Sequence, residues 1–178
     1  MTADSERRLI LVRHAKSAWP DVPDHERPLA PRGRRQAPLA GAWLRNAGYV
    51  PDLVLCSTAR RARETWRLIS DELGTSPQVT YEGQVYGADM ASLLQLVQQA
   101  PETVSKLLIV GHDPGIRDLA VTLADEGSSG RAGDALERVG VKFPTGAVAV
   151  LAVPGAWPDL GAGAARLTDF VVPRELKK

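Results

Sequence analysis

The sequence predicts an α/β protein, a three-layer α/β/α sandwich built on a mostly parallel central sheet. Two patterns support this prediction. Short runs such as LILV at residues 9–12 and LLIV at residues 107–110 are apolar at every position, which is typical of strands buried on both faces. These runs alternate along the chain with amphipathic segments of helical period, as expected when helices connect parallel strands.

The predicted elements follow one another in a regular order. Strands are expected at Leu9–Val12, Leu53–Cys56, Val79–Tyr81, Leu107–Val110, Ala147–Val153 and Arg166–Val171. Helices are expected at about Gly33–Ala47, Arg60–Leu73, Asp89–Gln99 and Ile116–Ala124. Gly48 lies where a C-cap glycine would end the first helix, and Pro114 lies where the last helix would begin. The glycine- and serine-rich segment Asp125–Gly133 is expected to be a flexible surface loop.

The composition is typical of a single globular domain that needs neither disulfides nor a structural metal. The chain has 178 residues, of which 44% are hydrophobic and 24% are charged, and it has 1 cysteine. A chain of this length buries a sizeable core. We therefore expect one domain over residues 1–178, with flexible ends at residues 1–7 and 174–178.

Charge and hydropathy argue against several classes of partner. The net charge of +1 gives no field that would favour nucleic acid or a membrane surface. No apolar run approaches the roughly 20 residues of a membrane span, and the N-terminus lacks the apolar segment of a signal peptide. The expected location is the cytoplasm, and the sequence indicates no particular oligomeric state.

Polar residues follow three of the expected strands at the point where each strand ends. Arg13 and His14 follow the first strand, Ser57 and Thr58 follow the second, and His112 follows the fourth. The helix after the second strand adds a group of arginines: Arg60, Arg61 and Arg63. Because ligands of open α/β sheets bind beyond the carboxyl ends of the strands, these histidines and arginines are expected at one edge of the sheet.

Arginine and neutral histidine together suit phosphoryl transfer. Guanidinium groups bind phosphoryl oxygens through paired donors, and a neutral imidazole can attack phosphorus. A cysteine-dependent phosphatase is disfavoured because Cys56 lacks an arginine six positions later, where Ala62 stands. A P-loop nucleotide site is excluded because the motif GxxxxGKS/T is absent from the sequence. A metal site is disfavoured because only His25 is left to join His14 and His112 as a histidine ligand. We therefore expect no metal and no other cofactor.

Four motifs, in this order, resemble the histidine phosphatase superfamily: LVRHAKSAW, RPLAPRGRRQA, STARRARETW and LLIVGHDPGI. The resemblance spans Leu9 to about Pro173 and implies a phosphoglycerate-mutase-like fold. Ala15 stands where the superfamily's RHG motif has a glycine. Three fragments are similar to the narrower branch of SixA-type phosphohistidine phosphatases: RPL at residues 27–29, GH at residues 111–112, and FPTGAVAVLAVPG.

The resemblance implies roles for residues at the expected sheet edge. His14 would be the nucleophile that becomes phosphohistidine, and Arg13 would bind the phosphoryl group. Arg61 would be a second phosphoryl ligand, since the superfamily's arginine follows the serine of STARRARETW by four positions, and His112 would complete the pocket. Arg27 matches an arginine that lines the site in the SixA-type branch. Attack requires one unprotonated nitrogen on His14, so we expect a backbone carbonyl to accept the other N–H.

Two carboxylates are candidates for a general acid. Glu82 lies at a strand end where a mutase-type acid would come. Asp113 directly follows His112, as in the superfamily's acid-phosphatase branch. Either can instead be a structural carboxylate that accepts backbone N–H groups at the start of a helix.

We expect the substrate to be phosphohistidine on a protein. Only about fifty residues separate Arg61 from His112, and the sheet and helices use nearly all of them, so no long insertion caps the site. An imidazole also leaves more readily than an alkoxide and needs less help from an acid. The alternatives are a phosphatase of small phosphate esters and a non-catalytic module that binds phosphoproteins, which would not need the nucleophile His14.

Overall fold

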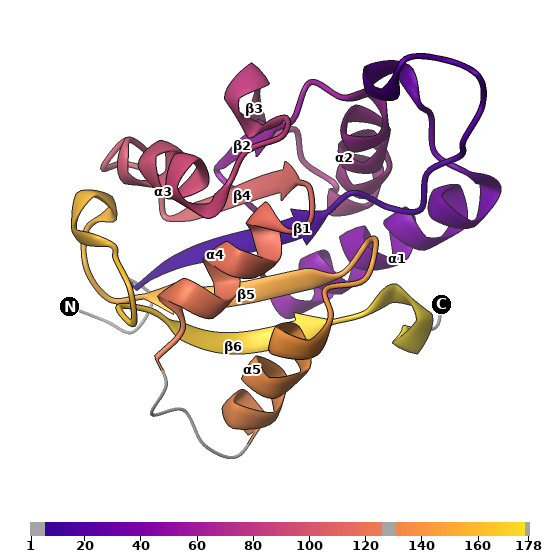
Figure 1. The fold of residues 1–178 in the computed structure, drawn as a ribbon. Helices are drawn as coiled ribbons and strands as arrows, with labels where there is room; N and C mark the ends of the chain where they lie inside the picture. Colours follow the sequence, from indigo (N-terminus) through magenta and orange to yellow (C-terminus); the bar gives the residue numbers. More distant parts are fainter. Residues whose placement is uncertain (1–5, 126–130, 177–178) are drawn as a thin grey trace.

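A computed structural model describes residues 6–125 and 131–176 of the chain, which form a sheet with helices on both faces (Figure 1). The strands are β1 (Arg7–Arg13), β2 (Leu53–Cys56), β3 (Gln78–Tyr81), β4 (Lys106–Gly111), β5 (Val148–Val153) and β6 (Arg166–Val171). The helices are α1 (Pro31–Ala47), α2 (Arg60–Leu73), α3 (Met90–Gln98), α4 (Gly115–Leu123) and α5 (Arg131–Val141). Short 3₁₀ helices complete the described fold: η2 (Asp24–Glu26), η3 (Gly83–Val85), η4 (Trp157–Asp159) and, after β6, η5 (Pro173–Glu175). None of the described helices is long and apolar enough to cross a membrane.

The sheet has the mostly parallel arrangement that the sequence predicts. Its strand order is β3-β2-β4-β1-β5-β6, and β1, β2, β3 and β4 run parallel. Within the described part of the chain, β5 is the strand that runs against its neighbours, β1 and β6. The chain therefore places β2 and β3 first and then returns to insert β4 between β1 and β2. A change of direction of this kind is where open α/β sheets bind ligands.

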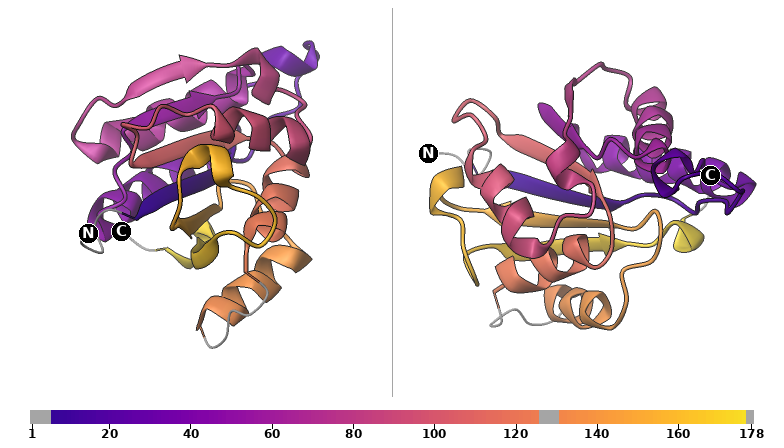
Figure 2. Two further views of the ribbon diagram at one scale, coloured as in Figure 1. Left: turned by 90° about the vertical axis from the view of Figure 1, so that its left-hand side faces the viewer. Right: turned by 45° about the horizontal axis from the view of Figure 1, so that its top comes forward.

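Alternate side chains of the central strands belong to two separate cores. In β1, Leu9 and Leu11 pack with residues of α3, α4 and α5, whereas Ile10 and Val12 pack with residues of α1 and α2. All four side chains are fully buried. This is why these strands are apolar at every position. Figure 2 shows the two helical layers on opposite sides of the sheet, and the predicted three-layer α/β/α fold is confirmed.

The structure corrects the prediction of one loop. The sequence predicts a flexible loop over Asp125–Gly133, but α5 begins at Arg131. Residues 126–130 lie outside the described residues. Ala135 and Val139 of α5 are buried against the core. Gly133 and Gly140 lower the intrinsic helix propensity of this segment, so its helical state depends on packing rather than on local preference.

The ordered fold also extends into both ends for which the sequence predicts flexibility. Arg7 belongs to β1, where it pairs with Val153 of β5. Pro173–Glu175 form η5. Residues 1–5, 177 and 178 lie outside the described residues.

Glycines allow α1 to pack closely against its neighbours. A Cβ added at Gly41 would lie 2.6 Å from the carbonyl oxygen of Ile69 in α2. A Cβ added at Gly33 would lie 2.2 Å from the carbonyl oxygen of Lys16, just after β1. The first turn of α1 is thereby held against the segment that follows β1. At the other end, Gly48 terminates α1 in the left-handed region with φ of 80°, as the sequence predicts.

We expect Gly41→Ala to lower the free energy of unfolding by about 1–3 kcal/mol, because the added methyl group would force α1 away from α2. Urea-induced unfolding followed by circular dichroism measures this. Gly140→Ala is the matched control, since nothing lies within 4 Å of its added Cβ. The control should leave stability unchanged or raise it by about 0.5–1 kcal/mol. Equal stability of Gly41→Ala and the wild type would contradict the close packing.

Candidate active site

The carboxyl ends of β1, β2 and β4 meet at one edge of the sheet. Arg13 pairs in register with Gly111, and the N–H of His14 donates to the carbonyl of Gly111 at 3.0 Å. Ser57, at the end of β2, hydrogen-bonds in the same way to β4. The three strands therefore end at the same level, and the ring centroids of His14 and His112 lie 5.2 Å apart.

A cavity of about 260 Å³ opens at these strand ends. Its lining contains every candidate residue from the sequence except Glu82: Arg13, His14, Arg27, Arg61, His112 and Asp113. The carboxylate of Glu82 instead accepts the N–H of Gln84 at 3.1 Å and caps η3. Of the two candidate acids, Asp113 is therefore the one placed at the cavity.

The His14 ring is held in the tautomer that a nucleophile needs. Its Nδ1 lies 2.8 Å from the carbonyl oxygen of Ala15. A carbonyl only accepts, so Nδ1 carries the proton and Nε2 is unprotonated. Burial lowers the pKa of His14 to about 3, and the nearby charges of Arg61 and Arg13 act in the same direction. The expected hydrogen bond from His14 to a backbone carbonyl is confirmed.

Thr65 of α2 connects the segment after His14 to the helix that carries Arg61. Its buried hydroxyl accepts the N–H of Ala15 at 2.9 Å and donates to the carbonyl of Arg61 at 2.8 Å. One side chain therefore fixes the end of β1 relative to the first turn of α2. The sequence does not point to Thr65, because its contact with Ala15 joins residues that are 50 positions apart along the chain.

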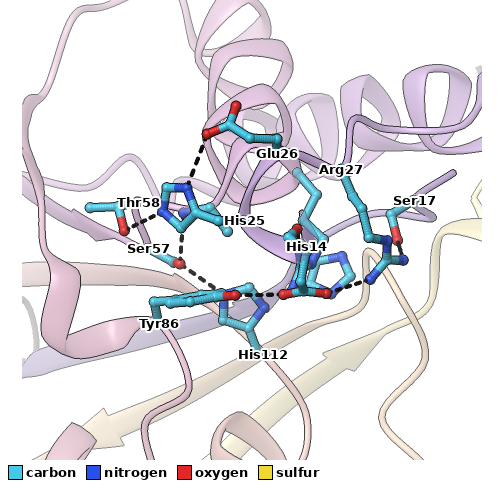
Figure 3. Close-up of polar contacts among 12 residues, drawn as sticks. His14, Ser17, His25, Glu26, Arg27, Ser57, Thr58, Tyr86 and His112 are labelled. Carbon is cyan, nitrogen blue, oxygen red and sulfur yellow. Dashed lines mark hydrogen bonds and ion pairs between the residues drawn. The ribbon is translucent and has the colours of Figure 1, made fainter. Parts of the chain in front are cut away.

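Asp24 joins two arginines of the site and, like Thr65, is not among the site residues that the sequence predicts. Its Oδ1 accepts from Nη1 of Arg27 at 3.0 Å. Its Oδ2 accepts from Nη2 of Arg61 at 3.1 Å and from the hydroxyl of Tyr86 at 2.6 Å. The bond from Tyr86, followed by that from Arg27, holds the pKa of Asp24 well below its usual range. Figure 3 shows this network extending from Tyr86 through Arg27 to Ser17.

The sequence carried a signal for part of this network. Asp24 precedes Arg27 by three residues, a spacing at which one helical turn allows an ion pair. The separations from Arg61, 37 residues, and from Tyr86, 62 residues, carry no periodic signal. These two contacts depend on how the η2 segment folds back over the sheet edge.

Arg27 holds an exposed aromatic residue at the edge of the cavity. Its Nε donates to the carbonyl of Ala18 at 3.0 Å, and its other nitrogens bond to Asp24 and Ser17. The guanidinium carbon lies 3.3 Å from the ring centroid of Trp19, whose side chain is 77% exposed. Since each of its three nitrogens donates a hydrogen bond to the protein, the guanidinium of Arg27 is held in place and helps to shape the cavity.

Three nitrogen atoms of the cluster lack a hydrogen-bond partner within the described part of the chain: Nε of Arg13, Nε of Arg61 and Nδ1 of His112. Nε2 of His112 is engaged by the hydroxyl of Ser57 at 2.8 Å. Burial and the charge of Arg61 lower the pKa of His112 to about 4, so this ring is neutral. A buried polar atom without a partner costs about 1–3 kcal/mol. A tetrahedral oxyanion would supply acceptors, so the cluster is suited to hold one.

Cys56 does not take part in this chemistry. Its side chain is fully buried, and burial raises the pKa of its thiol to about 12. The thiol is therefore protonated and a poor nucleophile. Among residues 6–125 and 131–176, no three His, Cys, Asp or Glu side chains are grouped so that they could hold a metal ion.

We expect the NMR signals of His14 and His112 to keep the positions of neutral imidazole from about pH 5 to about pH 8, because burial holds both pKa values below the ordinary value. Long-range ¹H–¹⁵N spectra measure this, with single His→Gln variants to assign the signals. In the unfolded chain these histidines bind protons with the ordinary pKa of ~6.5, whereas in the folded protein both pKa values are lower. The unfolded state therefore gains protons first as the pH falls below ~6.5, and the free energy of unfolding decreases. A titration midpoint near pH ~6.5 in the folded protein would contradict this expectation.

Comparisons with known proteins agree with the geometry. A model of the histidine phosphatase superfamily (branch 1) matches residues 9–83. The uncharacterized protein Rv1276c of Mycobacterium tuberculosis is 45% identical over 164 residues, which cover 92% of this chain and 100% of that protein. The match to the superfamily model includes the segments that carry Arg13, His14 and Arg61.

Solved structures extend the likeness to the whole fold. A candidate phosphohistidine phosphatase SixA from Nakamurella multipartitia is 38% identical, with a TM-score of 0.82 over 94% of this chain and 96% of its own. A second candidate SixA, from Agrobacterium tumefaciens, is 30% identical, with a TM-score of 0.76 over 94% of this chain and 98% of its own. The predicted phosphoglycerate-mutase-like fold is confirmed. The chain belongs to the histidine phosphatase superfamily and is a phosphatase of its SixA-type branch.

Proposed function

We propose that the protein removes the phosphoryl group from phosphohistidine on other proteins, through a phosphohistidine intermediate at His14. The observation that carries this proposal is the state of His14: Nδ1 is bound to the carbonyl of Ala15 and Nε2 is unprotonated. Arg13, Arg61 and His112 line the same cavity. The likeness to SixA structures from Nakamurella and Agrobacterium supports the choice of substrate.

The first step transfers the phosphoryl group to the enzyme. Nε2 of His14 attacks phosphorus, a P–N bond forms, and the bond from phosphorus to the substrate imidazole breaks. When that imidazole carries a proton on its other nitrogen, it leaves as a neutral ring and needs no general acid. Arg13 and Arg61 stabilise the charge on the equatorial oxygens, a role that metal ions fill in other phosphoryl transfer enzymes.

The second step returns the enzyme to its starting state. A water oxygen attacks phosphorus, the P–N bond to His14 breaks, and inorganic phosphate leaves. His14 returns to the neutral ring with its proton on Nδ1. His112, neutral before substrate binds, serves as a hydrogen-bond partner in both steps, and a phosphoryl dianion beside it favours its protonation.

The edge of the cavity suits a substrate presented on another protein. Trp19 lines the cavity and is largely exposed, and Trp is among the side chains that most often carry the binding energy where two proteins meet. The runner-up, a phosphatase of small phosphate esters, is favoured by the position of Asp113 in the same lining. An ester leaves as an alkoxide, and Asp113 would then be the acid that protonates it.

We expect His14→Ala to abolish turnover and to prevent labelling of the protein by [³²P]phosphohistidine in a rapid-quench experiment. The label on the wild-type protein should be acid-labile and should map to His14, also in the presence of a chelator. His25→Ala is the matched control and should be labelled normally, since His25 is not among the residues that line the cavity. Label on a serine or on Cys56 would overturn the mechanism, and binding without any turnover would indicate a phosphoprotein-binding module.

We expect kcat/KM for phosphohistidine to exceed that for phosphoserine, sugar phosphates and 3-phosphoglycerate. Asp113→Asn should slow ester cleavage by roughly 10²-fold or more, the usual contribution of a general acid, and should affect phosphohistidine cleavage much less. Glu82→Gln is the control, because Glu82 caps η3 away from the cavity. A sugar phosphate or phosphoglycerate that is turned over more efficiently than phosphohistidine would favour the runner-up.

A further inference from the structure

A second cavity, of about 340 Å³, lies beside the one that holds His14. The two cavities share Arg13, Lys16 and Thr145 in their linings. The second cavity adds Arg32, Lys142 and Arg174, and no Asp or Glu is among the described residues that line it. We call the group Lys16, Arg32, Lys142 and Arg174 the cationic cleft.

The four cations of the cleft come from four separate segments of the chain. Lys16 follows β1, Arg32 lies in the first turn of α1, Lys142 follows α5, and Arg174 lies in η5. Charges on the solvated face of one helix would all come from one segment of the chain. Here the fold brings together charges from distant segments. The N-terminus of α1 also lies here without a side-chain cap, and the partial positive charge of the helix end adds to that of the cations.

None of these four cations forms an ion pair with a described carboxylate, although such pairs are present nearby. Arg34, two residues after Arg32, pairs with Glu64 at 3.9 Å, and Glu175, next to Arg174, pairs with Arg138. The whole chain carries a net charge of only +1. Unpaired like charges in one cleft repel one another, so an anion that enters it relieves that repulsion.

We propose that the cationic cleft binds acidic side chains that lie next to the phosphohistidine on the substrate protein. The proposal rests on the proposed function and specifies its substrate. All four cations are exposed and spread over several segments, which fits a row of carboxylates on a protein surface better than one small tetrahedral anion. Since the two cavities share three lining residues, carboxylates in the cleft and a phosphoryl group at His14 can belong to one partner.

The test compares two phosphohistidine peptides that differ only in having Glu or Gln at the positions flanking the phosphohistidine. For the wild type, kcat/KM should be about tenfold higher for the Glu peptide at low salt, and the difference should shrink as the salt concentration rises. The triple variant Arg32→Gln, Lys142→Gln, Arg174→Gln should lose this preference. It should still cleave free phosphohistidine at the wild-type rate, because none of the three residues lines the cavity of His14.

The matched control is the triple variant Arg35→Gln, Arg67→Gln, Lys106→Gln, which has the same change of net charge outside the cleft. It should keep the preference for the Glu peptide. If free phosphohistidine is cleaved but the wild type does not distinguish the peptides, or if both triple variants behave alike, the inference is wrong and the proposed function stands. A bisphosphorylated small molecule is tested as a further substrate. If its cleavage is the only activity that the cleft variant loses, the cleft binds a second phosphate and the inference is overturned.

Failure of the proposed function is recognised separately. If the wild type cleaves neither free phosphohistidine nor the phosphohistidine peptides, the proposed substrate is wrong. The cleft is then tested without turnover, by fluorescence titration with the unphosphorylated Glu peptide. Binding that weakens in the cleft variant and not in the control variant supports the cleft as a site for acidic side chains, and equal binding refutes it.

Discussion

The register between β1 and β4 is the constraint on which the rest of the site depends. Arg13 pairs with Gly111, and the N–H of His14 donates to the carbonyl of Gly111, so both strands end at the same level. The first side chain after each strand is a histidine, and the two rings therefore meet. A slip of one residue would move the side chains of β1 to opposite faces and exchange its two cores. The burial of Leu9 to Val12 on both faces thus also fixes the position of His14.

Burial and charge act together to keep the ring of His14, the proposed nucleophile, neutral. His14 is removed from water and close to the charges of Arg13 and Arg61, and each of these effects disfavours protonation. The hydrogen bond to Ala15 opposes them, but its main consequence is to place the proton on Nδ1. The remaining nitrogen is then available as a nucleophile over the whole physiological range of pH.

Asp24 balances the positive charge that this arrangement requires. Two arginines close together repel each other, and the carboxylate of Asp24 accepts from both Arg27 and Arg61. Its bond with Tyr86 ties η2 to the segment after η3. Asp24 itself is largely exposed, so these ion pairs position the guanidinium groups more than they stabilise the fold. The cationic cleft, in contrast, contains no such carboxylate among the described residues that line it.

The sequence by itself determined the features that depend on neighbouring residues. Runs such as LILV and LLIV predict strands buried on both faces, and the residues that follow a strand must lie at its carboxyl end. The positions of Arg13, His14 and His112 at one edge of the sheet therefore follow from the order of residues along the chain. Gly48 as the end of α1 is predicted for the same reason.

Only the tertiary structure decided the contacts between distant segments. Asp24 with Arg61, Thr65 with Ala15, and Ser57 with His112 join residues whose spacing has no period. The helix α5, with glycines at positions 133 and 140, is stabilised by packing that its local sequence does not reveal. Glu82 and Asp113 are equal candidates in the sequence, and the fold separates them by placing one at η3 and the other in the cavity. The physical reason is common to all of these cases: hydrophobic periodicity indicates which face of an element is buried, but it does not indicate which polar side chains that burial brings together.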